Sequence, residues 1–79
     1  MNWQLCDFFE LGGRMLLTEE QELSLLKIRH RLVAMHVPFM YETQAEYKDR
    51  KRGRETQPWE PVLILWRPLT RVELNVLGC

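Results

Sequence analysis

The sequence predicts a small α+β fold, in which one long helix packs on a mostly antiparallel three-stranded sheet beside a short N-terminal helix or hairpin. Two observations predict this class. Apolar residues recur at helical spacing between residues 19 and 35, whereas later segments alternate or run continuously apolar, as strands do. A chain of 79 residues can form one small core, so we expect a single domain over residues 1–79.

The long helix is expected at residues 19–35. Thr18 is a suitable N-cap, and Gln21, three residues later, can complete a reciprocal capping box. Acidic residues fill the first turn and basic residues follow toward the end, which suits the helix dipole. Pro38 disfavours helical geometry at the residue before it and should close the element.

Three strands are expected after this helix. Residues 39–47 alternate between aromatic or small side chains and polar ones, as a strand with one buried face does. Residues 62–66 are all apolar, which favours a central strand covered on both faces. Residues 71–77 alternate again and favour a final strand, although Thr70 and Glu73 can instead form the capping box of a short helix.

The N-terminal segment allows two interpretations. Asn2 can cap a short helix that carries Phe8 and Phe9 on one side and stops at Gly12. Alternatively, Gly12 and Gly13 can form the turn of a hairpin. We favour the helix.

The two cysteines, Cys6 and Cys79, lie near opposite ends of the chain. Small secreted folds usually carry several cysteines, so we expect free thiols in a reducing compartment rather than a disulfide. The longest apolar run, residues 62–66, is too short to span a bilayer, and the first residues lack the pattern of a signal peptide. These observations predict a soluble, cytoplasmic protein without membrane contact.

Charge is distributed unevenly along a chain whose formal net charge is zero. Residues 1–26 hold one basic and five acidic side chains, residues 27–54 eight and three, and residues 55–79 two and three. The middle third is therefore positive while both flanks are negative. Such segregation predicts a dipolar surface that can steer a charged partner.

Patterns typical of catalysis or metal binding are missing from the sequence. Ser24 is the single serine and lacks the surroundings of a nucleophile elbow. His30 and His36 are six residues apart and do not share a helical face as metal ligands would. Cys6 is best explained as a small buried apolar residue. We therefore expect a protein that is not an enzyme and needs no metal or cofactor.

A basic loop at about residues 48–58 is the strongest functional signal, because five of the eleven Lys and Arg residues fall within seven positions. The candidate contact residues in it are Lys48, Arg50, Lys51, Arg52 and Arg54. Trp59 follows as a candidate apolar anchor. Arginine recognises carboxylates well and tryptophan often anchors interfaces, so the loop predicts a protein partner with an acidic surface.

The expected function is that of a small protein-interaction module, such as an inhibitor or adaptor of a larger assembly of the kind that phages and mobile elements encode. One alternative is a nucleic-acid-binding protein that uses the same cations and stacks bases on Tyr41, Tyr47 and Trp59. The zero net charge disfavours it. Another is a homodimerising structural subunit that pairs through an exposed strand edge. We also expect at least one tryptophan, Trp59 or Trp3, to be exposed.

Overall fold

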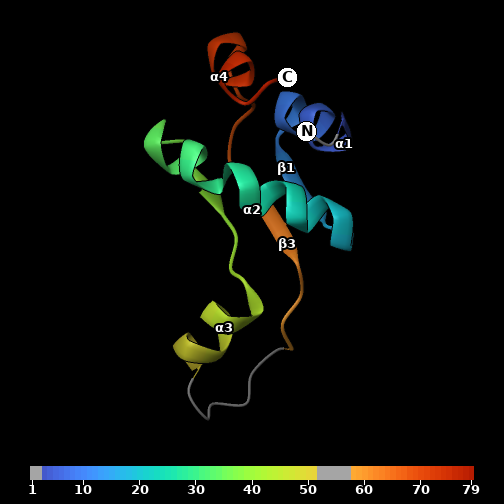
Figure 1. Ribbon diagram of the computed structural model, residues 1–79, viewed down its shortest axis with the longest axis vertical. Coiled ribbons are helices and arrows are strands. Elements are labelled where there is room, and N and C mark those ends of the chain that lie inside the picture. The colour runs from blue at the N-terminus through green and yellow to red at the C-terminus, as the bar shows by residue number, and fades with distance from the viewer. Residues whose placement is uncertain (1–2, 52–57) are drawn as a thin grey trace.

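The computed structural model describes residues 3–51 and 58–79, with a three-stranded antiparallel sheet and four helices in that part of the chain (Figure 1). The helices are α1 (Trp3–Leu11), α2 (Glu19–Ala34), α3 (Gln44–Lys51) and α4 (Arg71–Val76). The strands are β1 (Gly13–Leu16), β2 (Phe39–Met40) and β3 (Val62–Leu65). The predicted α+β class is confirmed, with helices packed against the sheet.

The strand order in the sheet is β1-β3-β2, and both pairs of strands are antiparallel. The apolar run therefore forms the central strand, as predicted. Its two faces differ, because Leu63 and Leu65 are buried while Val62 and Ile64 are only half-buried. The prediction of cover on both faces is wrong, and the helices bury one face of the sheet.

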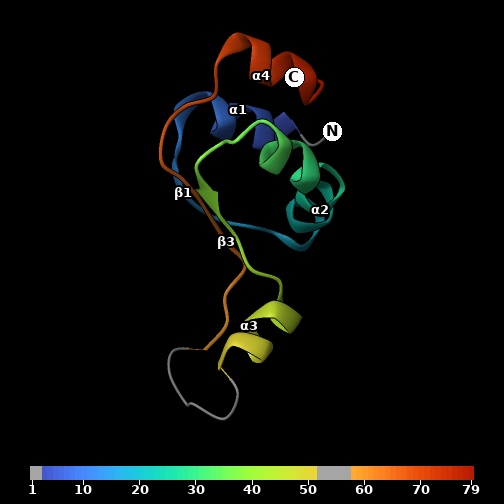
Figure 2. The same cartoon turned by 90° about the vertical axis from the view of Figure 1, so that its left-hand side faces the viewer.

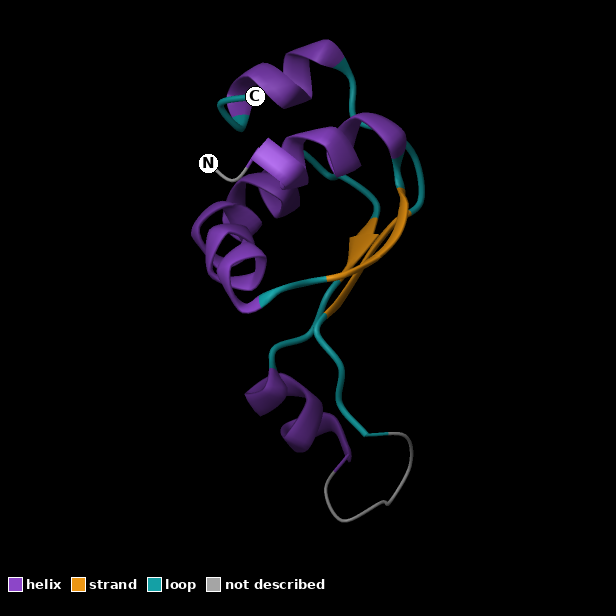
Figure 3. Cartoon of the chain, turned by 90° about the vertical axis from the view of Figure 1, so that its right-hand side faces the viewer, coloured by secondary structure: helices purple, strands orange, loops and turns teal. Residues whose placement is uncertain are grey.

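The hydrophobic core lies between that face and the helices α1 and α2 (Figures 2 and 3). Helix α2 contributes Leu25, Ile28 and Leu32, which are spaced three and four residues apart and are all buried. Helix α1 contributes Leu5 and Phe9, both completely buried. This helical spacing places apolar side chains on one stripe of each helix, so the sheet and the helices exclude water together.

Helix α2 begins as predicted and ends one residue earlier than expected. Thr18 and Gln21 form the capping box, with hydrogen bonds of 2.8 and 3.1 Å. At the other end His36 adopts a positive φ of 56°, and the Val37 N–H donates to the Leu32 carbonyl at 3.1 Å. This bond is the one that spans more residues of the two that define a Schellman motif. A residue in the left-handed conformation, His36, therefore ends the helix before Pro38.

The strand predicted at residues 39–47 is wrong, since only Phe39–Met40 is strand and α3 begins at Gln44. The Thr43 N–H donates to Glu46 Oε1 at 2.9 Å, and the Glu46 N–H donates to Thr43 Oγ1 at 3.1 Å. This reciprocal capping satisfies two backbone donors at once. A local cap therefore outweighed an alternating pattern that had no long strand beside it to pair with.

The strand favoured at residues 71–77 is also wrong, and the short helix that Thr70 and Glu73 can cap is present as α4. Their reciprocal hydrogen bonds measure 2.8 and 3.2 Å. The alternating residues do not mark a buried face, because Val72 and Val76 are exposed. The capping box again decided the local structure.

The N-terminal segment is the favoured helix, and its expected cap, Asn2, lies outside the described residues. Gly12 ends α1 with a φ of 75°, and its N–H donates to the Phe8 carbonyl at 2.8 Å. A Cβ at this glycine would lie 3.1 Å from the backbone of Arg67 and Pro68. Gly12 thus allows the chain to turn at once into β1, a strand that the sequence did not predict.

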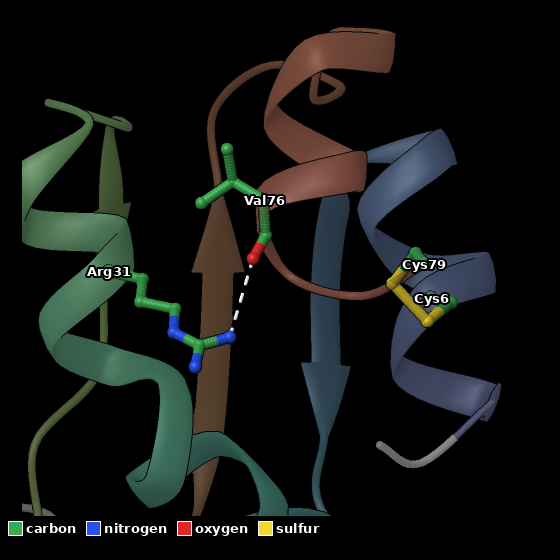
Figure 4. The surroundings of a disulfide bond; sticks show 4 residues. All are labelled: Cys6, Arg31, Val76 and Cys79. Atoms are coloured by element: carbon green, nitrogen blue, oxygen red, sulfur yellow. Dashed lines mark hydrogen bonds between the residues drawn. A yellow bond between two sulfur atoms is a disulfide. The ribbon is translucent and has the colours of Figure 1, made fainter.

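Cys6 and Cys79 form a disulfide, with their Cα atoms 5.7 Å apart (Figure 4). The expectation of free thiols is therefore wrong. Gly78 has a φ of 84° and the Cys79 N–H donates to the Leu74 carbonyl at 2.9 Å, so a second Schellman turn ends α4. That turn directs Cys79 back to α1. The separation of the two cysteines along the sequence does not indicate that they lie so close in space.

Within residues 3–51 and 58–79, no helix has the length and apolar character that crossing a membrane requires.

Candidate functional site

One face of the sheet remains without a helix. Its side chains alternate along the strands with the buried ones, and residues paired across strands point to the same side. We call this surface the uncovered sheet face, and its residues are Arg14, Leu16, Met40, Val62 and Ile64, together with Trp66, which directly follows β3 and whose backbone N–H donates to the Pro38 carbonyl at 3.0 Å. Leu16, Met40 and Trp66 expose 65, 49 and 62% of their surface.

Figures 2 and 3, which view the molecule from opposite directions, both show α1 and α2 on the same side of the sheet, away from the uncovered sheet face. None of the described elements lies over the uncovered sheet face. Isolated exposed apolar residues are common, but a contiguous patch on a sheet is typical of a binding surface. The uncovered sheet face is therefore the candidate functional site.

A pocket of about 240 Å³ deepens one end of this face, where α3 approaches the sheet. Ile64 and Met40 of the sheet line it together with the aromatic side chains of Tyr47 and Trp59. The indole N–H of Trp59 donates to the Glu42 carbonyl at 3.0 Å, which fixes the ring. Trp59 is half-buried, so it serves as a wall of a pocket rather than as the protruding anchor we expected.

The guanidinium of Arg50 is bound to a carboxylate of the same chain. It donates two hydrogen bonds to Glu42, of 2.8 and 2.9 Å, and lies 5.8 Å from the centre of the Tyr47 ring. Arg50 and Trp59, both predicted site residues, thus meet at the pocket through Glu42. Two bonds in this fork geometry hold Arg50 in place and offset its charge, which leaves less of it for a partner.

Lys48, the other described cation of the basic loop, is exposed on α3. Lys51 is the last residue of that helix, and its side chain lies outside the described part of the chain. Arg52 and Arg54 fall wholly outside it. The predicted loop therefore starts as helix, and of its described cations Arg50 lines the pocket.

Helix α3 is tied to α2 through Arg29. This residue donates to both carboxylate oxygens of Glu46, at 2.8 and 3.1 Å, and to the Tyr41 carbonyl at 3.1 Å. The Tyr41 hydroxyl in turn donates to Glu22 of α2. Burial and then this hydrogen bond raise the pKa of Tyr41 above its ordinary value. The network holds α3 at the end of the sheet and so maintains the pocket.

Arg14 supplies the exposed positive charge of the uncovered sheet face. It stands opposite Ile64 in the pairing of β1 with β3, and its nearest carboxylate, Glu60, is 3.9 Å away. Both side chains are largely exposed, and an ion pair of this length in water contributes little. Arg14 can therefore turn to a carboxylate of a partner at small cost.

Arg14, Leu16, Met40 and Trp66 are site residues that no local pattern in the sequence indicates. Of the two tryptophans whose side chains the structure describes, Trp66 is exposed and Trp59, one of the two we expected to be exposed, is half-buried; the Trp3 side chain lies outside the described part. The missing signal was the strand β1, because only its pairing with β3 shows which side chains share a face.

Across the described ranges, no three His, Cys, Asp or Glu side chains are grouped in a way that could hold a metal ion. His30 and His36 are both exposed.

No family model, no curated protein and no solved structure matches this chain.

Proposed function

We propose that this protein is a non-enzymatic interaction module that binds a protein partner through the uncovered sheet face. The observation that carries the proposal is the exposed apolar set of Leu16, Met40 and Trp66, of which Met40 also lines the pocket. Binding removes this apolar area from water, which is the main favourable contribution to protein association.

The partner in this proposal is an apolar surface that carries a carboxylate. One of its apolar side chains enters the pocket between Tyr47, Trp59 and Ile64. Its carboxylate meets Arg14, whose side chain is exposed at the rim of the pocket. The acidic partner expected from the basic loop is kept in this proposal, but its principal contact moves from Arg50 to Arg14, since Arg50 is bound to Glu42.

Nucleic acid is the less favoured partner. Phosphate binding depends on cations that are free to replace counterions. Arg29 and Arg50 are each held in two hydrogen bonds by a carboxylate, and Trp59 is half-buried and bonded to the backbone. These contacts reduce both the charge and the stacking surface on which that alternative relied.

Two face variants and a matched control test the proposal. Met40→Lys and Trp66→Ser alter exposed positions of the face, while Val72→Lys alters an even more exposed apolar position on α4. The wild type is cross-linked in its source cells, and the captured protein is then purified for hydrogen exchange in complex. We expect both face variants to lose the partner with unchanged melting temperature, Val72→Lys to keep it, and β1 and β3 amides to gain protection.

Retention of the partner by both face variants would refute the proposal. A variant with Gln at Arg50, Lys51, Arg52 and Arg54 tests the alternative with a random oligonucleotide. If nucleic acid is the partner, the wild type binds it with strong salt dependence and the Gln variant loses most of that dependence. We expect no such binding by the wild type.

A cytoplasmic location and a role as inhibitor or adaptor of a larger assembly remain part of the proposal. The disulfide argues against the cytoplasmic location, since reducing compartments normally keep thiols reduced. Alkylation of free thiols in intact source cells decides the matter. A cytoplasmic protein should be alkylated at both cysteines, whereas protection of both would place it in an oxidising compartment.

A further inference from the structure

Helix α2 carries a second apolar surface, on the side opposite its core contacts. We call it the α2 stripe, and it consists of Leu23, Leu26, His30 and Val33. The three apolar members expose 57, 41 and 59% of their surface. In Figures 2 and 3, α2 is the outermost element on the helical side of the molecule. The α2 stripe is therefore accessible to a flat or helical partner.

The spacing of the α2 stripe is that of a coiled-coil seam. Its members are separated by three, four and three residues, which corresponds to two successive pairs of a and d positions. A surface that only faces water has no need for apolar residues at this spacing. The stripe consequently fits another helix better than it fits an irregular loop.

Charges along α2 are sorted by sign. The first turn carries Glu19 and Glu20, while Lys27 and Arg31 lie in the second half. None of the ion pairs among the described residues uses Glu20 or Lys27. If a second copy of α2 packs antiparallel to the first, the acidic first turn of each copy lies against the basic second half of the other. In a parallel arrangement the two acidic first turns lie together and repel each other.

We propose that the α2 stripe binds the α2 stripe of a second copy of this chain, antiparallel about a twofold axis. Leu23 of each copy packs against Leu26 of the other, and Val33 then lies beyond the first turn of α2 in the other copy. At the flanks Glu20 faces Lys27, and Glu19 faces His30. Each contact occurs twice because the interface is related to itself by the twofold axis.

A shallow hollow on the α2 stripe fits this arrangement. Leu26, Arg29, His30 and Val33 enclose a volume of about 520 Å³. They stand at positions i, i+3, i+4 and i+7, which is the set of four that receives a side chain in a helix pair. In the proposed register the acidic first turn of the other copy covers this hollow, so Glu19 lies near His30, while the Arg29 guanidinium stays bound to Glu46.

The dimer should be weak, since one short helix pair buries less area than a standard stable interface. We expect a Kd of roughly 100 µM. Sedimentation equilibrium up to about tenfold above that value measures it. Leu26→Gln should raise the Kd about tenfold or more, because the substitution acts twice. Val72→Gln, at an exposed apolar position on α4, should leave the Kd unchanged.

Charge exchange tests the register. Glu20→Lys and Lys27→Glu should each weaken the dimer by setting like charges against each other, and the double variant should recover most of the wild-type Kd. A wild type that stays monomeric, a Leu26→Gln variant that dimerises normally, or a double variant without recovery would each overturn the proposal. Trp66→Ser should not change the Kd of the dimer. The dimer measurements therefore test the α2 stripe alone, and the partner-binding function proposed for the uncovered sheet face is tested separately.

Discussion

The guanidinium of Arg29 in α2 holds the carboxylate of Glu46 in α3 through two hydrogen bonds, 2.8 and 3.1 Å long. Arg67 and Glu73 repeat this arrangement beside α4, with bonds of 2.8 and 2.9 Å. In both cases the glutamate also completes a capping box with a threonine. One carboxylate thus starts a helix and binds it to a neighbouring segment.

Acid should weaken both arrangements. The hydrogen bonds from Arg29 and Arg67, and then those from the capped backbone, lower the pKa of Glu46 and of Glu73 from 4.5 to about 2. The folded state therefore binds these protons less readily than the unfolded state does. Their contribution to stability is complete above about pH 4.5 and is lost as the pH falls toward 2. Carboxyl NMR titration checks this, and ordinary pKa values for both would contradict it.

Replacing Glu46 by glutamine should loosen α3 without unfolding the domain. Glutamine keeps a capping oxygen but loses the charge that binds Arg29, and such an exposed pair contributes about 1 kcal/mol or less. Hydrogen exchange of α3 amides should become faster, whereas α2 amides keep their rates. Glu60→Gln serves as the control, since its 3.9 Å contact with Arg14 is long and exposed. Equal exchange in α3 of both variants would show that Arg29 does not hold the helix.

Reduction of the Cys6–Cys79 bond should lower stability strongly. The bond joins residues 73 positions apart, and closing a loop of this size in the unfolded chain stabilises the fold by about 4 kcal/mol. Urea unfolding with and without reductant measures the difference. A Cys6→Ser, Cys79→Ser variant should match the reduced protein and ignore the reductant. If the oxidised and reduced proteins unfold at the same urea concentration, the cross-link does not form or does not constrain the unfolded chain.

Glycine at position 36 should stabilise the protein. His36 has a φ of 56°, a conformation that glycine adopts without steric cost, so His36→Gly should gain about 0.5–1 kcal/mol in unfolding free energy. The same substitution at His30, within α2, should instead cost roughly 0.4 kcal/mol, because glycine is a poorer helix former than histidine. Thermal melts of the two variants compare them directly. Destabilisation by His36→Gly would mean that the imidazole makes contacts that matter more than the backbone.

One sequence signature shows how much of the fold can be predicted. It is a threonine followed three positions later by Gln or Glu, and it occurs three times within the described residues. It was read correctly at Thr18, kept as an alternative at Thr70 and overlooked at Thr43, and a capped helix begins at all three. In the two wrong predictions an alternation of period two was preferred. Over six to nine residues that alternation is weaker physical evidence than a cap, because a strand also needs a neighbour to pair with.

The candidate site was harder to predict because it depends on contacts between distant segments. The basic loop and Trp59 were found from local composition, and Arg50 and Trp59 do lie together at the pocket. The uncovered sheet face needs the pairing of β1 with β3 and the position of α2, neither of which a single sequence displays. Trp66 is exposed because of these long-range contacts, and the residues beside it in the sequence do not indicate its exposure.

The disulfide turns most of the chain into a ring, since every peptide bond between Cys6 and Cys79 lies on a loop closed by sulfur (Figure 4). A protease that cuts once inside this ring produces two polypeptides that cannot diffuse apart. The cut molecule keeps almost its full mass on a non-reducing gel and separates into two fragments only after reduction. Arg31 adds a hydrogen bond of 3.3 Å from α2 to the Val76 carbonyl near the closure. The oxidised protein can therefore survive a single cleavage as one particle, and loses that tolerance when its two sulfur atoms are separated.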